Sequence, residues 1–121
     1  MPDPRHRLGI AAEAAVAIHL ESRGWRIVER RWRCRFGEID LVCLDPGGVL
    51  VGVEVRARRT KRAGSPLESI DARRLHRLRA SLMEYTTSYR GRYDGLRIDL
   101  AAVERPDGVW RIRFHSAVDA W

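Results

Sequence analysis

The segment FGEIDLVCLDPGGVLVGVEVRAR, residues 36–58, limits the fold more than any other part of the sequence. On both sides of DPGG, apolar residues alternate with polar or small ones, a pattern typical of paired strands. DPGG itself is a turn sequence, because proline suits the first central position of a type I turn and glycine suits the left-handed region. We therefore predict a β-hairpin with its loop at residues 46–48, in which Asp45 pairs with Val49.

The length of this loop decides which side chains share a face of the hairpin. With the loop at residues 46–48, one face is apolar throughout. Its predicted cross-strand pairs are Ile39 with Val55, Leu41 with Val53, and Cys43 with Val51. A loop shorter by one residue would move carboxylates onto this face, since such a shift turns every side chain of a strand over. We expect the apolar face to pack on the core.

The opposite face of the predicted hairpin is charged, with Asp40 opposite Glu54 and Glu38 opposite Arg56. Directly opposed β-carbons lie about 4.5 to 5.5 Å apart, so the carboxylates of the first pair would repel each other unless a cation lies between them. Magnesium takes oxygen ligands from such a pair, and Arg56 could bind a phosphate oxygen, a combination suited to cleaving a phosphodiester. The alternative is a solvated, salt-bridged surface outside the core, and the spacing alone leaves both interpretations open.

Helices and further strands are predicted on both sides of this hairpin. Residues 5–23 are rich in alanine and end before Gly24, which suits a helix with a C-terminal glycine cap. Ser65 begins SPLE, a capping-box sequence, and apolar residues three and four positions apart then predict a helix to about Tyr89. Its expected buried stripe consists of Leu75, Leu78, Leu82, Tyr85 and Tyr89. Strands are predicted at residues 25–33, 95–104 and 108–114.

These elements predict one α/β domain over residues 1–121, since a chain of this length supports a single core. The net charge of +7 favours a polyanionic partner such as nucleic acid or an anionic membrane surface, although a solvated basic surface would explain it equally. Glu13 and His19 interrupt the N-terminal apolar run, so we expect neither a signal peptide nor a membrane span there. Cys34 and Cys43 form no CxxC pair, which predicts reduced thiols in a cytoplasmic protein.

Several motifs run through the chain in a fixed order: GIAAEAAVAIHLESRGW, RFGEIDLV, VEVRAR, AGSPLESI, LRIDLAAV and the terminal HSAVDAW. In order and spacing they resemble the YraN-like family of uncharacterised predicted endonucleases. That family is similar to the PD-(D/E)XK nucleases, a superfamily that includes archaeal Holliday junction resolvases. The resemblance implies a restriction-endonuclease-like three-layer fold, with a central mixed sheet of about five strands flanked by helices. It also implies DNA as the partner.

Carried over by position, the catalytic acids implied by the resemblance are Glu13 on a helix and Asp40 and Glu54 on strands. Magnesium or manganese is the implied cofactor. Asp40 and Glu54 would bind it directly, the main-chain carbonyl of Val55 is a further candidate ligand, and Glu13 would reach it directly or through water. The helical neighbours of Glu13 are uncharged, so Glu13 is either partly buried against the sheet or the exposed point of an alanine-rich helix. Glu38 also belongs to the family pattern, which assigns it no role.

The catalytic lysine of the family motif falls on Arg56, where this sequence departs from the pattern. Arginine keeps the positive charge and binds phosphate, but a pKa above about 12 prevents it from acting as a general base. Among the 23 basic residues only Lys61 is a lysine, so the change reflects either a general preference for arginine or a loss of catalysis. Two functions stay open: a metal-dependent endonuclease acting on DNA, including branched DNA, and a catalytically weak or inactive nucleic-acid-binding or scaffold protein.

Contacts with nucleic acid are expected beside the site and along the second predicted helix. The predicted residues are Arg56, Arg58, Arg59, Lys61, Arg73 and Arg77. Of these, Arg73 and Arg77 fall on the side of the helix opposite its apolar stripe. The sequence specifies neither the DNA structure that is bound nor the oligomeric state, and a homodimer remains open.

Overall fold

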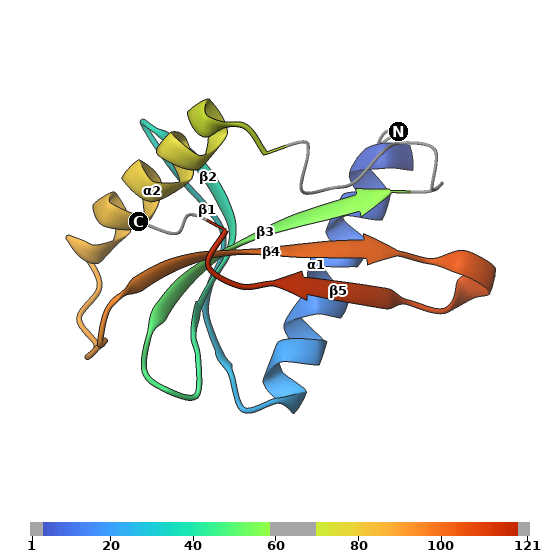
Figure 1. Cartoon of the computed structure of the whole chain (residues 1–121), viewed down its shortest axis with the longest axis horizontal. Coiled ribbons are helices and arrows are strands. Elements are labelled where there is room, and N and C mark those ends of the chain that lie inside the picture. The colour runs from blue at the N-terminus through green and yellow to red at the C-terminus, as the bar shows by residue number, and fades with distance from the viewer. Residues whose placement is uncertain (1–3, 59–69, 119–121) are drawn as a thin grey trace.

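A five-stranded sheet in the order β1-β2-β3-β4-β5 forms the centre of the molecule. The structure is a computed structural model that describes residues 4–58 and 70–118. Its elements are α1 (Pro4–Ser22), β1 (Arg26–Cys34), β2 (Gly37–Leu44), β3 (Leu50–Arg58), α2 (Ala72–Thr86), β4 (Leu96–Glu104), the 3₁₀ turn η3 (Pro106–Gly108) and β5 (Arg111–His115). Strands β1, β2 and β3 form an antiparallel meander, β4 runs parallel to β3, and β5 returns antiparallel to β4 (Figure 1). The sheet is therefore mixed, as predicted.

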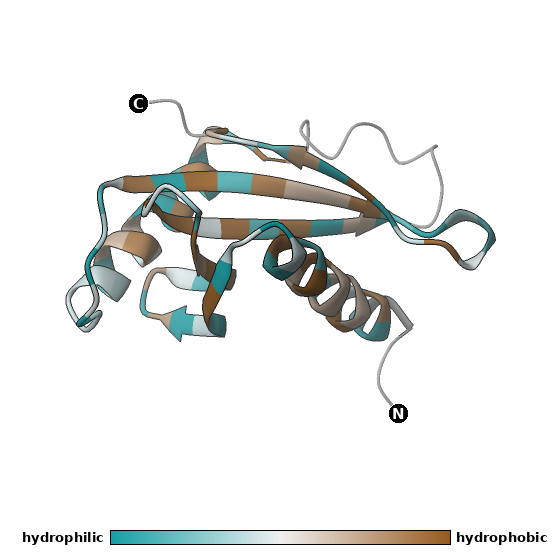
Figure 2. Cartoon of the chain, turned by 90° about the horizontal axis from the view of Figure 1, so that it is seen from below, coloured by the Kyte–Doolittle hydropathy of each residue, from teal (hydrophilic) through white to brown (hydrophobic). Residues whose placement is uncertain are grey.

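The two α-helices of the described residues cover opposite faces of this sheet, which confirms the predicted three-layer α/β architecture. Helix α1 passes behind β4 and β5 in Figure 1. Val53 packs in the cluster that contains Val16 of α1, whereas Leu50, on the other face of β3, packs with Leu82 of α2. Polar and apolar residues alternate along the strands in Figure 2. Because helices cover the central strands from both sides, both faces of β3 belong to the core.

The face that carries Glu54 is therefore not the outer, non-core face predicted from the hairpin alone. Gly52 lies on the same face under α2, where an added β-carbon would come within 3.1 Å of Ile98 Cδ1 and 3.8 Å of Leu82 Cδ1. Glycine carries no side chain and so gives no apolar signal in the alternation, although its lack of a side chain lets Ile98 pack closely. The prediction was wrong because the covering helix comes from a distant part of the chain.

The predicted hairpin register is confirmed near the turn. Leu41 pairs with Val53 and Cys43 with Val51, the Asp45 main-chain nitrogen donates to the Val49 carbonyl over 3.0 Å, and the loop contains Gly48 at φ +89°. The pairing does not continue past Leu41, so the predicted pairs of Ile39, Asp40 and Glu38 with Val55, Glu54 and Arg56 are wrong. The reason is local: the Val55 main-chain nitrogen donates to the side chain of Asp40. Ile39 packs on the α2 side.

Helix α2 is shorter than predicted at both ends. It begins at Ala72, with Asp71 as N-cap accepting a 2.8 Å hydrogen bond from the Arg74 main-chain nitrogen. The predicted capping box at residues 65–68 lies outside the described residues. The helix ends at Thr86 rather than Tyr89, and the hydroxyls of the next residues, Thr87 and Ser88, bond back to carbonyls of the last turn. The predicted apolar stripe is confirmed, with its residues buried or partly buried in the cluster on this face.

The other predicted elements are confirmed within a few residues. Helix α1 ends at Ser22, and Gly24, at φ +87°, reverses the chain after it. Strand β1 carries a bulge between Ile27 and Glu29, and the turn η3 joins β4 to β5. Across residues 4–58 and 70–118, we find no helix long and apolar enough to cross a membrane.

Candidate functional site

Asp40 and Glu54 lie together where β2 and β3 stop pairing. Glu54 is in the middle of β3 and is 1% exposed. Asp40 Oδ2 accepts a hydrogen bond of 2.8 Å from the Val55 main-chain nitrogen, which holds its carboxyl group against β3. Burial, a side-chain hydrogen bond with Glu54 and the charge of Glu54 together raise the pKa of Asp40 to about 8. Close to neutral pH Asp40 therefore keeps its proton.

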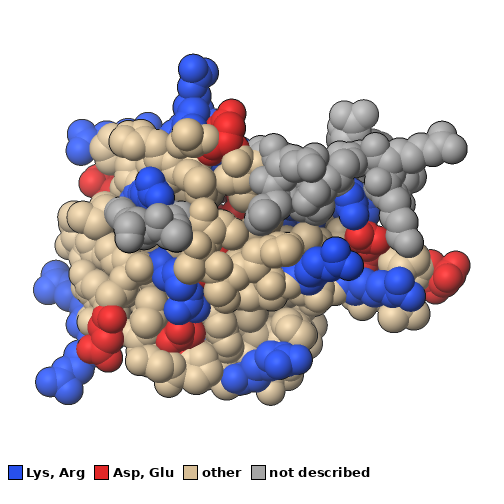
Figure 3. Space-filling model, viewed as in Figure 1, with Lys and Arg blue, Asp and Glu red and all other residues tan. Residues whose placement is uncertain are grey.

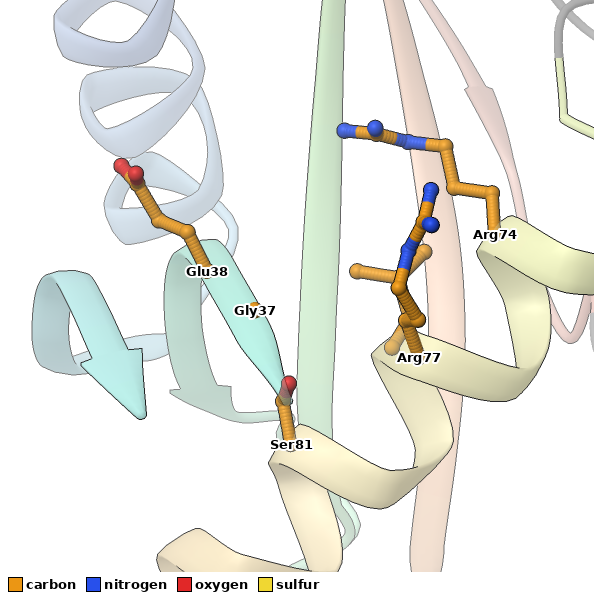
Figure 4. A pocket seen from close by; sticks show the side chains of 6 residues that line it. Gly37, Glu38, Arg74, Arg77 and Ser81 are labelled. Atoms are coloured by element: carbon orange, nitrogen blue, oxygen red, sulfur yellow. The ribbon is translucent and has the colours of Figure 1, made fainter. Parts of the chain in front are cut away.

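Arg74, in the first turn of α2, is the principal cation beside Glu54. Its Nε and Nη2 atoms both contact Glu54 Oε2, and Figure 4 shows its side chain extending from α2 towards β3. The sequence patterns did not single out Arg74. The available signal was its spacing, because Arg74, Leu78 and Leu82 follow one another at intervals of four residues on the apolar stripe of α2. A charged residue on such a stripe requires a partner.

Arg56 is a second cation at the same carboxyl group. Its Nη2 atom lies 3.6 Å from Glu54 Oε2, and its side chain is 33% exposed. Its Nε atom is buried and has no hydrogen-bond partner among the described residues. The predicted combination of Asp40, Glu54 and Arg56 is therefore brought together, and Arg74 adds a cation that the sequence analysis missed.

Glu13 of α1 is partly buried, with 16% of its side chain exposed, which decides between the two placements that the sequence left open. Its carboxyl Oε1 lies 3.6 Å from Arg31 Nε. Burial raises the pKa of Glu13, the charge of Arg31 lowers it, and the charges of Glu38 and Glu54 raise it further. Glu13 thus belongs to the same electrostatic cluster as Glu54, with Arg31 as its ion-pair partner.

Glu38 forms ion pairs with β1 and not with the predicted Arg56. Its Oε2 atom accepts a 2.9 Å hydrogen bond from Arg33 Nε, and its Oε1 atom lies 3.9 Å from Arg31 Nε. Arg31 has φ +51°, in the left-handed region, and its guanidinium lies near both Glu38 and Glu13. In this structure Glu38 is therefore the ion-pair partner of these two arginines.

The donor chemistry of Asp40 and Glu54 fits a hard divalent cation. Carboxylate oxygens are the ligands that magnesium prefers, and a cation in place of the proton would relieve the repulsion between the two groups. In the part of the chain that the structure describes, no group of three His, Cys, Asp or Glu side chains could hold a metal ion. The two strand acids are thus the candidate protein ligands, while the carbonyl of Val55 and the carboxyl of Glu13 remain predicted ligands.

The basic residues predicted to bind nucleic acid do not form one group. Arg58 Nη2 is engaged with Glu104 Oε1 over 2.9 Å. Arg73 and Arg77 are both exposed on α2, but Arg77 borders a pocket together with Leu78 of the apolar stripe, so the prediction that Arg77 lies opposite this stripe is wrong. Arg59 and Lys61 lie outside the described residues. Figure 3 shows the arginines of the described residues spread over this face of the molecule instead of gathered in one patch.

The fold and the site define an α/β protein that buries paired carboxyl groups beside arginines in the middle of a mixed sheet. The chain belongs to the uncharacterised protein family UPF0102, whose family model matches residues 12–103. This confirms the predicted YraN-like relationship. The matched span contains every side chain of the site, from Glu13 to Arg74.

Related proteins are similar along most of the chain. A UPF0102 protein of Deinococcus radiodurans is 46% identical over 108 residues, which are 86% of this chain and 88% of that protein. A UPF0102 protein of Anaeromyxobacter dehalogenans is 40% identical over 118 residues, which are 97% of this chain and 87% of that protein. Among solved structures, a repair endonuclease from Pyrococcus abyssi is similar, with a TM-score of 0.47 and 16% identity. That similarity covers 89% of this chain and 41% of the endonuclease.

Proposed function

We propose that the protein is a metal-dependent endonuclease that hydrolyses phosphodiester bonds of DNA, with branched or otherwise structured DNA as its substrate class. The observation that carries the proposal is the buried Asp40–Glu54 pair. Two carboxyl groups so close together raise each other's affinity for a cation, and strongly perturbed acids concentrate at functional sites. The free thiols of Cys34 and Cys43 fit a cytoplasmic protein.

Asp40 and Glu54 would hold a magnesium or manganese ion, with the carbonyl of Val55 as a third ligand and Glu13 reaching the site directly or through water. When bound, the ion supplies Lewis acidity towards the phosphoryl oxygens and lowers the pKa of its water. In the hydrolysis, a water oxygen adds to phosphorus and the bond to the leaving oxygen breaks, which yields a phosphate monoester end and a hydroxyl end. Arg56 and Arg74 lie where guanidinium groups would bind the phosphate oxygens and stabilise their charge.

The second candidate function is a nucleic-acid-binding or scaffold protein with weak or absent catalysis. The observation that favours it is the position of arginines at Glu54: Arg74 contacts Oε2 and Arg56 lies 3.6 Å from it. An arginine at the lysine position cannot serve as a general base. Both functions share the basic surface, so binding of a divalent ion and cleavage distinguish them.

The experiment combines calorimetric titration of magnesium or manganese with a cleavage assay on duplex, single-stranded and four-way DNA. We expect wild-type protein to bind the ion and to cleave at least one DNA form, and Asp40→Asn to lose both properties. Asp107→Asn is the matched control, since Asp107 is exposed in the β4–β5 turn at φ +54°, a conformation that asparagine also adopts. Unchanged ion binding in Asp40→Asn would contradict the assignment.

Arg56 separates the two candidate functions. If the enzyme is limited by its non-ideal cation, Arg56→Lys should raise metal-dependent cleavage on the order of 100-fold, the usual effect of one well-placed transition-state donor. Arg56→Ala should be the slowest of the three proteins. Equal inactivity of all three on every DNA form, with ion binding intact, would favour the binding protein. A wild type faster than Arg56→Lys would mean that the site has adapted to the guanidinium.

A further inference from the structure

A pocket of about 250 Å³ lies between the start of β2 and one stripe of α2. It is lined by Gly37, Glu38, Arg74, Arg77, Leu78 and Ser81. The four α2 residues have the spacing i, i+3, i+4 and i+7, so they face the same side of the helix. The volume far exceeds the roughly 30 Å³ share of one water molecule, so the pocket has room for a small polar group.

Ser81 provides the first sign that this pocket takes a ligand. The residue is fully buried, and its hydroxyl has no hydrogen-bond partner among the described residues. This is unusual in the molecule, because Ser22, Thr86 and Thr87 all donate to a main-chain carbonyl three residues earlier. A buried hydroxyl without a partner is unfavourable. The Ser81 side chain extends towards Gly37 at the floor of the pocket (Figure 4).

Gly37 places no side chain against that hydroxyl. It adopts φ +146°, which side-chain-bearing residues rarely do, and an added β-carbon would lie 3.6 Å from Ser81 Oγ. Any other residue at this position would therefore place a methyl or larger group against the hydroxyl. Backbone conformation and space together favour glycine here, so no side chain at position 37 occupies the space beside Ser81 Oγ.

The charge in the pocket is positive. Arg77 forms no ion pair with any described carboxylate, and its guanidinium borders the pocket. The carboxylate of Glu38 is already paired with Arg33 over 2.9 Å and points away from Ser81 in Figure 4. Arg74 is shared between the pocket and Glu54. An unneutralised guanidinium beside a free hydroxyl suits an anion with several acceptor oxygens.

We propose that this pocket binds a phosphate group of a nucleic-acid strand, beside the Asp40–Glu54 site, with Arg77 and Ser81 as its principal donors. Arg74 connects the two places, because it lines the pocket and contacts Glu54. A strand whose reacting phosphate lies at the carboxyl pair would thus be held by a second phosphate in the pocket. The identity of the strand rests on the proposed function, whereas the affinity of the pocket for phosphate does not.

The test uses the full chain in EDTA, with inorganic phosphate titrated at constant ionic strength and followed by amide NMR. We expect saturable shifts at Gly37 and Ser81. Ser81→Ala and Arg77→Gln should each weaken phosphate binding roughly tenfold, the effect of one hydrogen bond to a charged group. Arg92→Gln is the matched control, because this substitution removes an exposed arginine charge from a residue that does not line the pocket. Ser81→Ala should fold well, since it deletes a buried hydroxyl that has no partner.

Non-saturable shifts would contradict phosphate binding in the pocket, as would equal losses in Arg92→Gln and Arg77→Gln with none in Ser81→Ala. A second arm, also in EDTA, measures fluorescence anisotropy of single strands with and without a 5′-phosphate. If Ser81→Ala binds both strands more weakly than wild type does, the pocket binds a backbone phosphate. If it binds only the phosphorylated strand more weakly, the pocket binds the phosphate at the strand end. No loss on either strand would overturn the nucleic-acid assignment. Because no metal is present, absence of cleavage leaves these outcomes unaffected.

Discussion

Asp40 keeps a proton that an exposed aspartate would release. Burial favours its neutral form, and the hydrogen bond and charge of Glu54 add to this effect. The pair is therefore unfavourable for folding in the absence of a cation, while the same proximity makes it a good site for one. Replacing Asp40 by asparagine should therefore improve folding without a cation and weaken the binding of a cation.

We predict that Asp40→Asn stabilises the metal-free protein at neutral and higher pH. The pKa of Asp40 is raised in the folded protein, so stability from its proton is fully present below its ordinary pKa and is lost as pH rises towards about 8. Asparagine keeps an oxygen for the Val55 nitrogen and does not titrate. The gain should be on the order of 1 to 3 kcal/mol near pH 8 and much smaller near pH 4.

Urea unfolding in EDTA across this pH range measures the effect. Asp107→Asn again serves as control, because its exposed carboxyl should leave the pH dependence of wild type unchanged. Parallel stability curves for wild type and Asp40→Asn would show that the pKa of Asp40 is not raised in the folded protein.

At the scale of elements, α2 closes the site and also supplies its cation. Its N-cap, Asp71, sets where the helix begins and so places Arg74 in the first turn. From there Arg74 reaches Glu54, whereas Leu78 and Leu82 of the same stripe pack on the sheet. The position of α2 thus determines both the burial of Glu54 and the arginine that compensates its charge.

We predict that Arg74→Gln destabilises the metal-free protein more than Arg73→Gln does. Glu54 is 1% exposed, and losing its principal cation leaves a buried charge only partly compensated by Arg56 at 3.6 Å. The loss should be on the order of 2 kcal/mol, below the usual value for a fully buried pair because 34% of the Arg74 side chain is exposed. Urea unfolding in EDTA provides the comparison.

If magnesium binds at Asp40 and Glu54, adding it should recover part of this loss in Arg74→Gln, since a cation at the carboxyl pair replaces the missing charge. Equal stability of the two arginine variants in EDTA would mean that Arg74 contributes little to the folded state.

At the scale of the whole molecule, the net charge of +7 is the dominant feature. Part of the positive charge is used inside the protein. Arg97 lies 2.9 Å from both Asp45 and Asp99, and Arg58 lies 2.9 Å from Glu104. Residues such as Arg73 and Arg77 stay exposed and available for phosphate. Affinity for a polyanion should therefore come from a subset of the arginines.

We predict that nucleic-acid affinity falls steeply between about 50 and 200 mM salt, because each phosphate contact releases counterions. Arg77→Gln should reduce the slope of log affinity against log salt by about 1. Fluorescence anisotropy with DNA and RNA measures both quantities. Negligible affinity for both polymers at the lower salt concentration would rule out nucleic acid as the partner.

The sequence by itself determined the features that depend on neighbours in the chain. The turn DPGG and the alternation specify the register of Leu41 with Val53 and of Cys43 with Val51, because one residue of slip would turn every side chain of the strand to the other face. The spacing of apolar residues specifies the buried stripe of α2 in the same way. The sequence also predicted that Asp40 and Glu54 lie close together, although the direct pairing from which this was argued does not form.

Only the tertiary structure decided what covers these features. It places α2 over Gly52 and Glu54, ends the β2–β3 pairing at Leu41, and brings Arg74 to the buried acid. Turn geometry and side-chain periodicity act over a few residues, so they can be read from a short window of sequence. The contact of α2 with β3 at the site joins residues 20 positions apart, Arg74 and Glu54. Their partners follow from how the whole chain packs, which no local pattern encodes.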